Sequence, residues 1–187
     1  MLDLDEVKHF VQKSFEQNAE NKNVEHFERT VYWTKQLKPN ADEVILIAAY
    51  AHDIARAFRG RTLKDTLQNH EWNDPEILQE HQTKGAKIMT EFLTKKGFEK
   101  DKIERIANMI LKHEFGGDEE SNLIKDADSI SYLEINVLQH IKKLVVVFNK
   151  NKIKRKTDWM FERISSENAK QIAKPFYKEA IKVLKST

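Results

Sequence analysis

The chain has 187 residues, of which 40% are hydrophobic and 33% charged, and it contains no cysteine. This length suits one domain with a sizeable core, and the composition is typical of a globular protein with a well-solvated surface. The formal net charge of +2 is too small to indicate binding to nucleic acid or a membrane. Without cysteine, disulfides and thiolate metal ligands are excluded.

The N-terminal segment MLDLDEVKHF lacks the basic and apolar regions of a secretory signal. The longest apolar run is far shorter than the roughly 18 residues that a membrane helix needs. We therefore expect a cytoplasmic protein, with neither a membrane nor nucleic acid among its partners. Only five Gly and three Pro interrupt the chain, and no repeat or linker is found, so a single domain over residues 1–187 is expected.

Helical periodicity recurs along the whole chain, whereas sustained strand-like alternation does not. The sequence predicts an all-α helical bundle with helices over residues 4–19, 23–38, 41–58, 75–96, 100–114, 121–149 and 158–185. The β-rich segment LVVVF at 144–148 lies inside a helical pattern and is expected to be helical. Pro175 is expected to kink the last helix or to split it.

In the second predicted helix, His26 lies beside Arg29 and Thr30. In the third, the segment VILIAAYA at 44–51 is apolar on every side of a helix and is therefore expected in the middle of the core. His52 and Asp53 follow it directly. Burying ionisable groups is costly unless they are paired or bound to a metal, so this pair indicates a site.

The fourth and fifth predicted helices each carry a histidine on their apolar stripe. His81 shares its stripe with Ile77, Gly85, Ile88 and Phe92, and His113 ends the stripe of Ile103, Ile106 and Ile110. Nitrogen and carboxylate ligands without sulfur suit Mn, Fe, Zn, Co or Mg. The sequence therefore predicts a divalent metal site that His52, Asp53, His81 and His113 share.

The sixth predicted helix offers two acidic candidates two residues apart. Asp126 lies on a stripe with Leu123, Ile130 and Leu133, and Asp128 lies on one with Ile124 and Ile135. Periodicity does not decide between them. Because residues two apart project to nearly opposite sides of a helix, the two carboxylates are not expected to bind one ion.

Five cations occur within seven residues in the run KNKIKRKTD at 150–158. No aromatic residue is interleaved with them, so a solvated loop between helices is favoured over a nucleotide-binding or other polyanion-binding segment. The C-terminal stripe is expected to pack in the core or to form a dimer surface, which allows a homodimer; it comprises Phe161, Ile164, Ile172, Phe176 and Leu184.

The order His26, His52-Asp53, His81, His113 and a final Asp resembles the HD-domain superfamily of metal-dependent phosphohydrolases, over about residues 20–135. The segments AAYAHDIAR, HQTKGAKIM and ILKHEFGGD are similar to its motifs. The resemblance implies an HD-type bundle, with residues 136–187 forming further C-terminal helices. The family pattern A-D-x-apolar matches residues 127–130, so the resemblance selects Asp128 as the final ligand.

Carried over to this chain, the resemblance implies that His26, His52, Asp53 and Asp128 hold one metal. In family members with two metals, Asp53 bridges the ions, and His81 and His113 bind the second. Arg29 and Arg56 follow ligand positions by one helical turn and are candidates for binding phosphate, with Lys84 and Lys125 as weaker ones. His9, His70 and His140 match no family position and are expected to be surface or incidental residues.

The implied function is hydrolysis of a small phosphorylated substrate, a nucleotide-like phosphoester or phosphoanhydride, by metal-activated water. One alternative is a di-iron oxygenase resembling myo-inositol oxygenase, which uses the same ligand order. Another is a non-catalytic binding module that keeps the fold. The segment FGGD after Glu114 lacks the Gly-Tyr-Pro of cyclic-di-GMP phosphodiesterases, so that substrate is not expected, whereas the ligand pattern also resembles that of hydrolases of dinucleoside polyphosphates.

Overall fold

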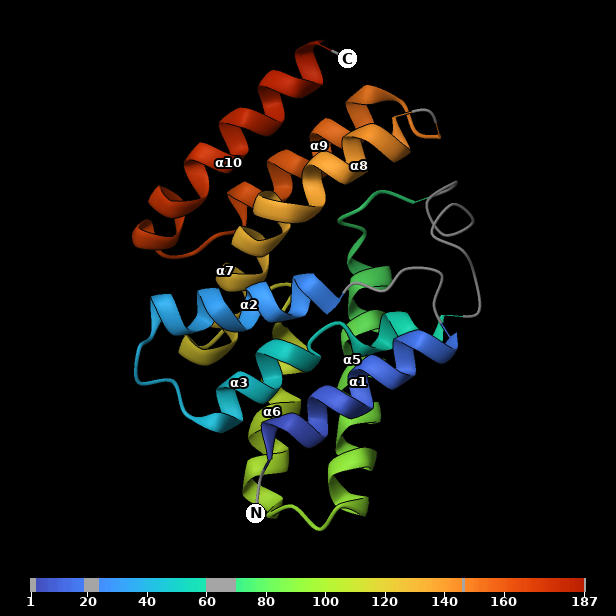
Figure 1. Cartoon of the computed structure of the whole chain (residues 1–187), viewed down its shortest axis with the longest axis vertical. Helices are drawn as coiled ribbons and strands as arrows, with labels where there is room; N and C mark the ends of the chain where they lie inside the picture. The colour runs from blue at the N-terminus through green and yellow to red at the C-terminus, as the bar shows by residue number, and fades with distance from the viewer. Residues whose placement is uncertain (1–2, 19–23, 60–69, 146, 187) are drawn as a thin grey trace.

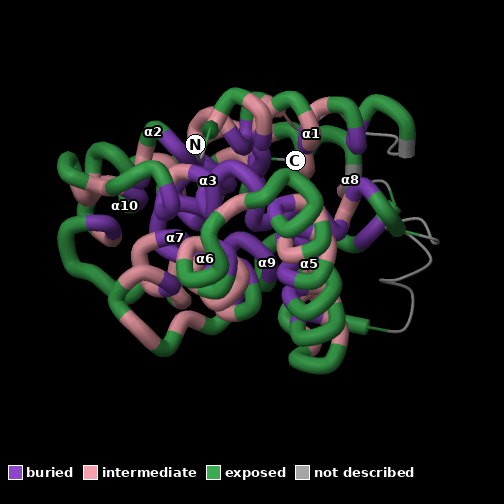
Figure 2. Tube along the Cα trace, turned by 90° about the horizontal axis from the view of Figure 1, so that it is seen from below, coloured by how far each residue is buried: buried purple, intermediate pink, exposed green. Residues whose placement is uncertain are grey.

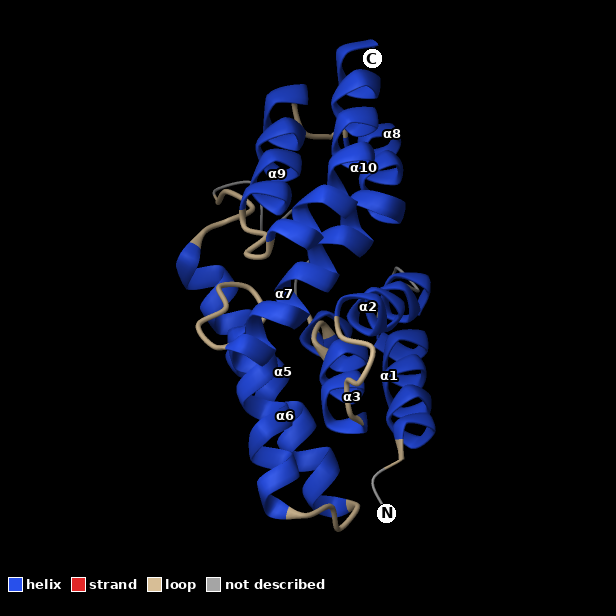
Figure 3. Cartoon of the chain, turned by 90° about the vertical axis from the view of Figure 1, so that its left-hand side faces the viewer, coloured by secondary structure: helices blue, strands red, loops and turns tan. Residues whose placement is uncertain are grey.

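Helices account for all the regular secondary structure of residues 3–18, 24–59, 70–145 and 147–186, which this computed structural model describes (Figure 3). The all-α prediction is therefore confirmed for these residues. In chain order the elements are α1 (Leu4–Asn18), α2 (Val24–Leu37), α3 (Glu43–Ala51), the 3₁₀ helix η1 (Ile54–Phe58), α5 (Pro75–Lys95), α6 (Lys100–Lys112), α7 (Glu119–Ser131), the π-helical segment η2 (Tyr132–Asn136), α8 (Val137–Leu144), α9 (Lys150–Glu162) and α10 (Glu167–Ser186). Within the described part of the chain, no helix is long and apolar enough to cross a membrane.

Two hydrophobic clusters build the core. The first lies among α1, α2, α3, α5 and α6, and the second among η2, α8, α9 and α10. Figure 1 shows α8, α9 and α10 together at one end of the molecule and α1, α3, α5 and α6 at the other. Helix α7 connects the ends, because its Ile124 is buried in the first cluster and its Ile130 in the second. Each such buried side chain contributes about 1.5–3 kcal/mol of transfer free energy.

Helix α3 is the most deeply buried element, and seven of its nine residues are buried (Figure 2). The carboxylate of Asp42 caps it by accepting from the backbone N–H of Ile45 at 3.0 Å. The predicted helix over 41–58 is wrong in its second half, because α3 ends at Ala51 and a turn at His52 and Asp53 leads into η1. A segment that is apolar on every side has no periodicity to mark where the helix stops.

The turn after α3 determines how the two polar residues are directed. Asp53 has φ −97° and ψ 12°, in the bridge region between helical and extended backbone. Adjacent residues of a continuous α-helix do not face each other. The turn therefore lets the side chains of His52 and Asp53 reach the same buried position.

The predicted helix over 121–149 is divided in the structure. Helix α7 is followed by η2, in which the N–H of Val137 donates to the carbonyl of Tyr132, five residues earlier. Helix α8 then ends at Leu144, and Val145 already lies in a turn. The helical prediction for 144–148 is thus wrong for its described residues after Leu144. Consecutive β-branched valines lower the helix propensity of this segment, and here their preference prevails.

The prediction for the C-terminal third is wrong in two respects. The basic run at 150–158 is not a loop, because it lies in α9, whose first turn is capped by Asn149 through the N–H of Lys152 at 2.9 Å. The predicted helix over 158–185 is broken between α9 and α10, where the hydroxyl of Ser166 accepts from the N–H of Ala169 at 3.1 Å. Pro175 lies within α10 and does not split it.

Asp118 is the N-cap of α7, and its substitution tests how much this cap stabilises the fold. Its carboxylate accepts from the N–H of Ser121 at 2.8 Å and from Lys112 Nζ at 3.0 Å. Burial raises the pKa of Asp118, but these hydrogen bonds outweigh it, and the pKa is lowered from 3.8. We expect Asp118→Ala to lower the free energy of unfolding by about 1 kcal/mol at pH 7.

The pH dependence of this effect follows from the direction of the shift. Because the pKa is lower in the folded state than in the unfolded state, the carboxylate stabilises the fold above about pH 4 and loses this contribution as the pH falls further. Urea unfolding at about pH 7 and pH 2.5 should therefore show a smaller difference between wild type and variant at the lower pH. The exposed Glu91→Ala in α5 is the control, and an equal difference at both pH values would contradict the explanation.

Candidate metal centre

The structure brings together the side chains of all six residues that the family resemblance implied as ligands. They come from α2, the turn after α3, α5, the end of α6, and α7, and they are His26, His52, Asp53, His81, His113 and Asp128. The side chains of the six residues are at most 9% exposed. Such burial of ionisable groups requires compensation within the cluster.

One half of the cluster is formed by His26, His52 and Asp128. The Nε2 atom of His26 lies 3.0 Å from Oδ1 of Asp128, and Nε2 of His52 lies 3.5 Å from the same oxygen. His52 Nε2 is also 3.7 Å from Oδ2 of Asp53. Two imidazole nitrogens and two carboxylates thus surround one position.

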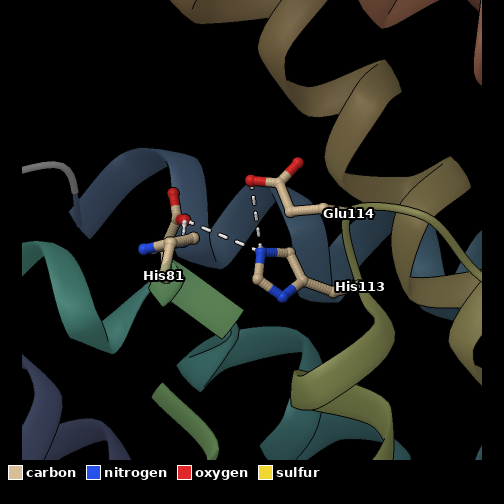
Figure 4. Close-up of side chains that lie close together, drawn as sticks. His81, His113 and Glu114 are labelled. Atoms are coloured by element: carbon tan, nitrogen blue, oxygen red, sulfur yellow. Dashed lines mark hydrogen bonds and ion pairs between the residues drawn. The ribbon is translucent and has the colours of Figure 1, made fainter. Parts of the chain in front are cut away.

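The other half is formed by His81, His113 and Glu114 around the second oxygen of Asp53. His81 Nε2 donates to Asp53 Oδ1 at 2.8 Å, and His113 Nε2 lies 3.9 Å from that oxygen. Figure 4 shows Glu114 beside the imidazole of His113, with Oε1 3.6 Å from Nε2. Asp53 belongs to both halves, and in each half its oxygen and the histidine nitrogens lie within 4.8 Å of one another.

Backbone contacts set the tautomers of two histidines. Nδ1 of His52 donates to the carbonyl of Ala49 at 2.8 Å, and Nδ1 of His113 donates to the carbonyl of Ile110 at 2.7 Å. A carbonyl only accepts, so in both residues Nδ1 carries a proton and Nε2 of the neutral ring has a free lone pair. Both histidines are C-caps, of α3 and α6, and each uses the carbonyl three residues earlier.

The Nε2 atoms of His52 and His113 are buried and have no hydrogen-bond partner among the described residues. Leaving a buried polar atom unsatisfied costs about 1–3 kcal/mol. Both atoms are directed at carboxylate oxygens, so a cation bound between them would satisfy the nitrogens and neutralise the acids. The residues therefore fit a metal ion, and the outward hydrogen bond of each ring is the usual support of a histidine ligand.

His26 is oriented by a similar contact with Ser131. The hydroxyl of Ser131 donates to the carbonyl of His26 at 3.0 Å and accepts from Nδ1 of the same residue at 2.8 Å. Nε2 of His26 is thereby directed at Asp128. Burial lowers the pKa of His26 and outweighs the pairing with Asp128, which favours the neutral imidazole that metals bind.

The two aspartates of the cluster, Asp53 and Asp128, are held in their ionised form. Burial raises the pKa of Asp53, but Arg56 and His52 outweigh it and keep the pKa well below 3.8. Burial also raises the pKa of Asp128, and there Arg163 and His26 outweigh it in the same direction. The pKa of His52 is raised although burial lowers it, because Asp53 and Asp128 lie beside the ring. This position thus favours positive charge, whether a proton or a metal ion supplies it.

Asp126 and Asp128 have separate roles in the structure. The carboxylate of Asp126 accepts from the backbone N–H groups of Ser165 and Ser166, at 2.7 and 2.9 Å, and so fixes the connection between α9 and α10. Asp128 faces His26 and His52 instead. The two residues project to different sides of α7, as their spacing of two requires.

The two arginines expected near phosphate differ in their surroundings. Arg56 lies beside the cluster, with Nε 2.7 Å from Asp53 Oδ1, and its side chain is 34% exposed. Arg29 instead pairs with Glu134 through Nε and Nη2, at 2.8 and 2.7 Å, and its guanidinium lies over the ring of Tyr32. None of the contacts described for Arg29 is with the six residues of the cluster.

The two lysines proposed as weaker phosphate-binding candidates are also engaged elsewhere. Lys84 Nζ donates to the carbonyl of Phe58 at 2.5 Å. Lys125 Nζ donates to the hydroxyl of Ser165 at 2.6 Å, so it supports the connection after α9. Both therefore have structural partners outside the cluster.

Sequence reasoning missed two residues that the structure places at the cluster. The guanidinium of Arg163 bonds to the carboxylates of both Glu114 and Asp128, and its Nε donates to the hydroxyl of Ser129 at 2.8 Å. Glu114 could have been found, since it follows His113 directly. Nothing in the sequence signals Arg163, because it lies 35 residues beyond Asp128, at a helix end that the periodicity did not reveal.

The three histidines outside the family pattern have no described hydrogen bond or ion pair with the six cluster residues. His9 is exposed, and exposed His70 pairs with Asp74 at 2.7 Å. His140 is not a plain surface residue, which corrects the expectation for it. Its Nδ1 lies 3.2 Å from the hydroxyl of Tyr132, and burial lowers its pKa to about 3.

An open groove of about 690 Å³ also lies on α5, but on a face different from that of His81. It is lined by Pro75, Glu76, Gln79, Glu80, Thr83, Lys84, Lys87 and Phe115. None of the six cluster residues lines it. The groove therefore does not define the candidate site, which is the buried cluster.

Comparison with known families gives one match. A family model described as a domain of unknown function, DUF4202, matches residues 5–184, almost the whole chain. The protein therefore belongs to the DUF4202 family. Neither the curated proteins nor the solved structures contain a match.

Proposed function

We propose that this protein is a metal-dependent phosphohydrolase of the HD type, acting on a small phosphorylated and nucleotide-like substrate. The observation that carries the proposal concerns the Nε2 atoms of His52 and His113, which are buried, have no hydrogen-bond partner among the described residues and are directed at ionised carboxylates. The resemblance of the ordered ligands to the HD superfamily supports the reaction class. The expected cellular location is the cytoplasm.

The donor arrangement supports one or two ions. His26, His52, Asp53 and Asp128 would hold the first, and Asp53, His81 and His113 would hold the second, with Asp53 shared. Four imidazoles favour Mn, Fe, Co or Zn over Mg, whose preferred ligands are oxygens. Because His81 Nε2 donates to Asp53, metal binding at this nitrogen would require the proton of the neutral ring to move to Nδ1.

A bound divalent cation supplies hydroxide near neutral pH and neutralises charge on phosphoryl oxygens. The protein's own groups would position the substrate. Arg56 is held beside Asp53 and is partly exposed, so its remaining N–H groups are able to bind a phosphoryl oxygen. Arg163 balances the charge of Glu114 and Asp128 and holds these carboxylates in place.

The test is metal analysis followed by assays for hydrolysis. We expect the full chain, purified without added metal and then reconstituted, to bind one or two equivalents of Mn, Fe, Co or Zn. Release of phosphate from a panel of nucleotides and nitrophenyl phosphates should depend on this metal and be lost on chelation. Bound iron with oxygen uptake and no phosphate release would favour the oxygenase alternative. Bound metal with neither activity would favour a binding module.

A further inference from the structure

Lys156 is a buried cation that the proposed chemistry does not use. It lies in the middle of α9, and only 8% of the residue is exposed, whereas its neighbours Lys154 and Arg155 are exposed. Its Nζ lies 4.5 Å from the ring centroid of Trp159, 5.4 Å from that of Tyr132 and 5.7 Å from that of Trp72. Three aromatic rings from three separate segments thus surround one ammonium group.

The ammonium group of Lys156 has no hydrogen-bond acceptor among the described residues, and no described carboxylate forms an ion pair with it. An ammonium offers three donors, and burying it without a polar partner is unfavourable. The aromatic faces attract the cation but accept no conventional hydrogen bond. The indole Nε1 of Trp72, whose ring lies near this ammonium group, is a buried donor that has no hydrogen-bond partner among the described residues.

The charges around Lys156 favour an anion. Burial lowers its pKa to about 7, and Arg163 and Arg56 act in the same direction. Glu114 and Asp128 act to raise the pKa of Lys156, but both carboxylates are already bonded to Arg163. The N–H donors of Lys156 and Trp72 therefore lack hydrogen-bond acceptors among the described residues. An anionic ligand would supply these acceptors.

We propose that Lys156 and Trp72 form an anion subsite beside the metal centre that binds a phosphoryl group of the substrate. Tyr132 and Trp159 line this subsite and hold the lysine side chain in place. The assignment of the anion as a phosphoryl group rests on the proposed function. The presence of the subsite rests on the unpartnered donors alone.

The experiment measures binding of inorganic phosphate to the full chain, with and without bound metal, by calorimetry and by tryptophan fluorescence. Lys156→Gln should raise the Kd for phosphate by at least about tenfold, because a charge-assisted hydrogen bond is lost. Its metal content should be unchanged. Lys150→Gln removes the same charge from an exposed position of α9 and should change the Kd by less than about twofold.

Two further variants test the donors separately. Lys156→Arg keeps the charge and should retain most of the affinity. Trp72→Phe keeps an aromatic ring but removes the indole N–H, and it should weaken phosphate binding by about three- to tenfold. Trp72→Phe also keeps the test valid if Lys156→Gln does not fold.

The outcomes separate this inference from the proposed function. Phosphate binding that is unaffected by Lys156→Gln and Trp72→Phe would overturn the subsite, as would a wild-type protein that binds no phosphate in either form. If the protein binds no metal but still binds phosphate through Lys156, the hydrolase proposal fails while the subsite stands.

Discussion

Asp53→Asn is expected to remove metal binding and phosphate hydrolysis together. Asp53 is the acid common to both halves of the cluster, and the amide keeps its shape but removes its charge. Loss of a residue that merely supports a metal ligand already costs about 10- to 100-fold in affinity, so loss of this carboxylate should cost more than about 100-fold. Hydrolysis should fall by at least about 1000-fold, because charge stabilisation in the transition state is lost as well.

The same change should destabilise the metal-free protein. Removing the charge leaves Arg56, His52 and His81 without their shared partner. Breaking a buried ion pair typically costs about 3–5 kcal/mol, and we expect the lower end because Arg56 is partly exposed and able to turn to solvent. Urea unfolding and elemental analysis measure the two effects, and the exposed Asp101→Asn is the control. A variant that keeps wild-type metal stoichiometry would refute the assignment of Asp53.

The second large effect is a contrast between two acids of α7. Asp128→Asn should lower the metal affinity by more than about 100-fold, because Asp128 faces His26 and His52. Asp126→Asn should leave the metal content unchanged and lower the free energy of unfolding by about 1–3 kcal/mol, because its bonds to Ser165 and Ser166 weaken.

These two variants are matched, since both acids are buried on one helix and each loses the same charge. Calorimetric titration with Mn or Zn and urea unfolding distinguish them. If Asp126→Asn lost metal and Asp128→Asn retained it, the cluster would be assigned to the wrong acid of α7.

The sequence predicted the parts of the fold that depend on periodic burial. Helices α1, α2, α5 and α6 agree with the prediction to within two residues, because each presents one apolar face to the core. The end of α3 was not predictable in this way, since every face of that helix is buried. The break before α10 had a local signal in Ser165 and Ser166, which are typical helix-capping residues, and this signal was overlooked.

The candidate site shows a similar division. His52, His81 and His113 were found because polar side chains on apolar faces are unusual. The role of Asp126 as a support for Ser165 and Ser166 was not predictable, because it depends on how α9 and α10 approach α7. Lys156 was grouped with its exposed neighbours, since a run of cations on a helix does not reveal which one is turned inward.

The π-helical segment η2 fixes the rotation of one half of the molecule relative to the other. One residue of an α-helix corresponds to about 100° of rotation, and a π turn contains one residue more than an α-helical hydrogen-bonded turn. Deleting a single residue there would turn Val137 and Ile141 of α8 away from the second hydrophobic cluster. Helix α9, which carries Lys156 and is capped at its C-terminus by Arg163, would then lose its packing against α8, so a one-residue deletion outside the proposed metal ligands would displace both Lys156 and Arg163.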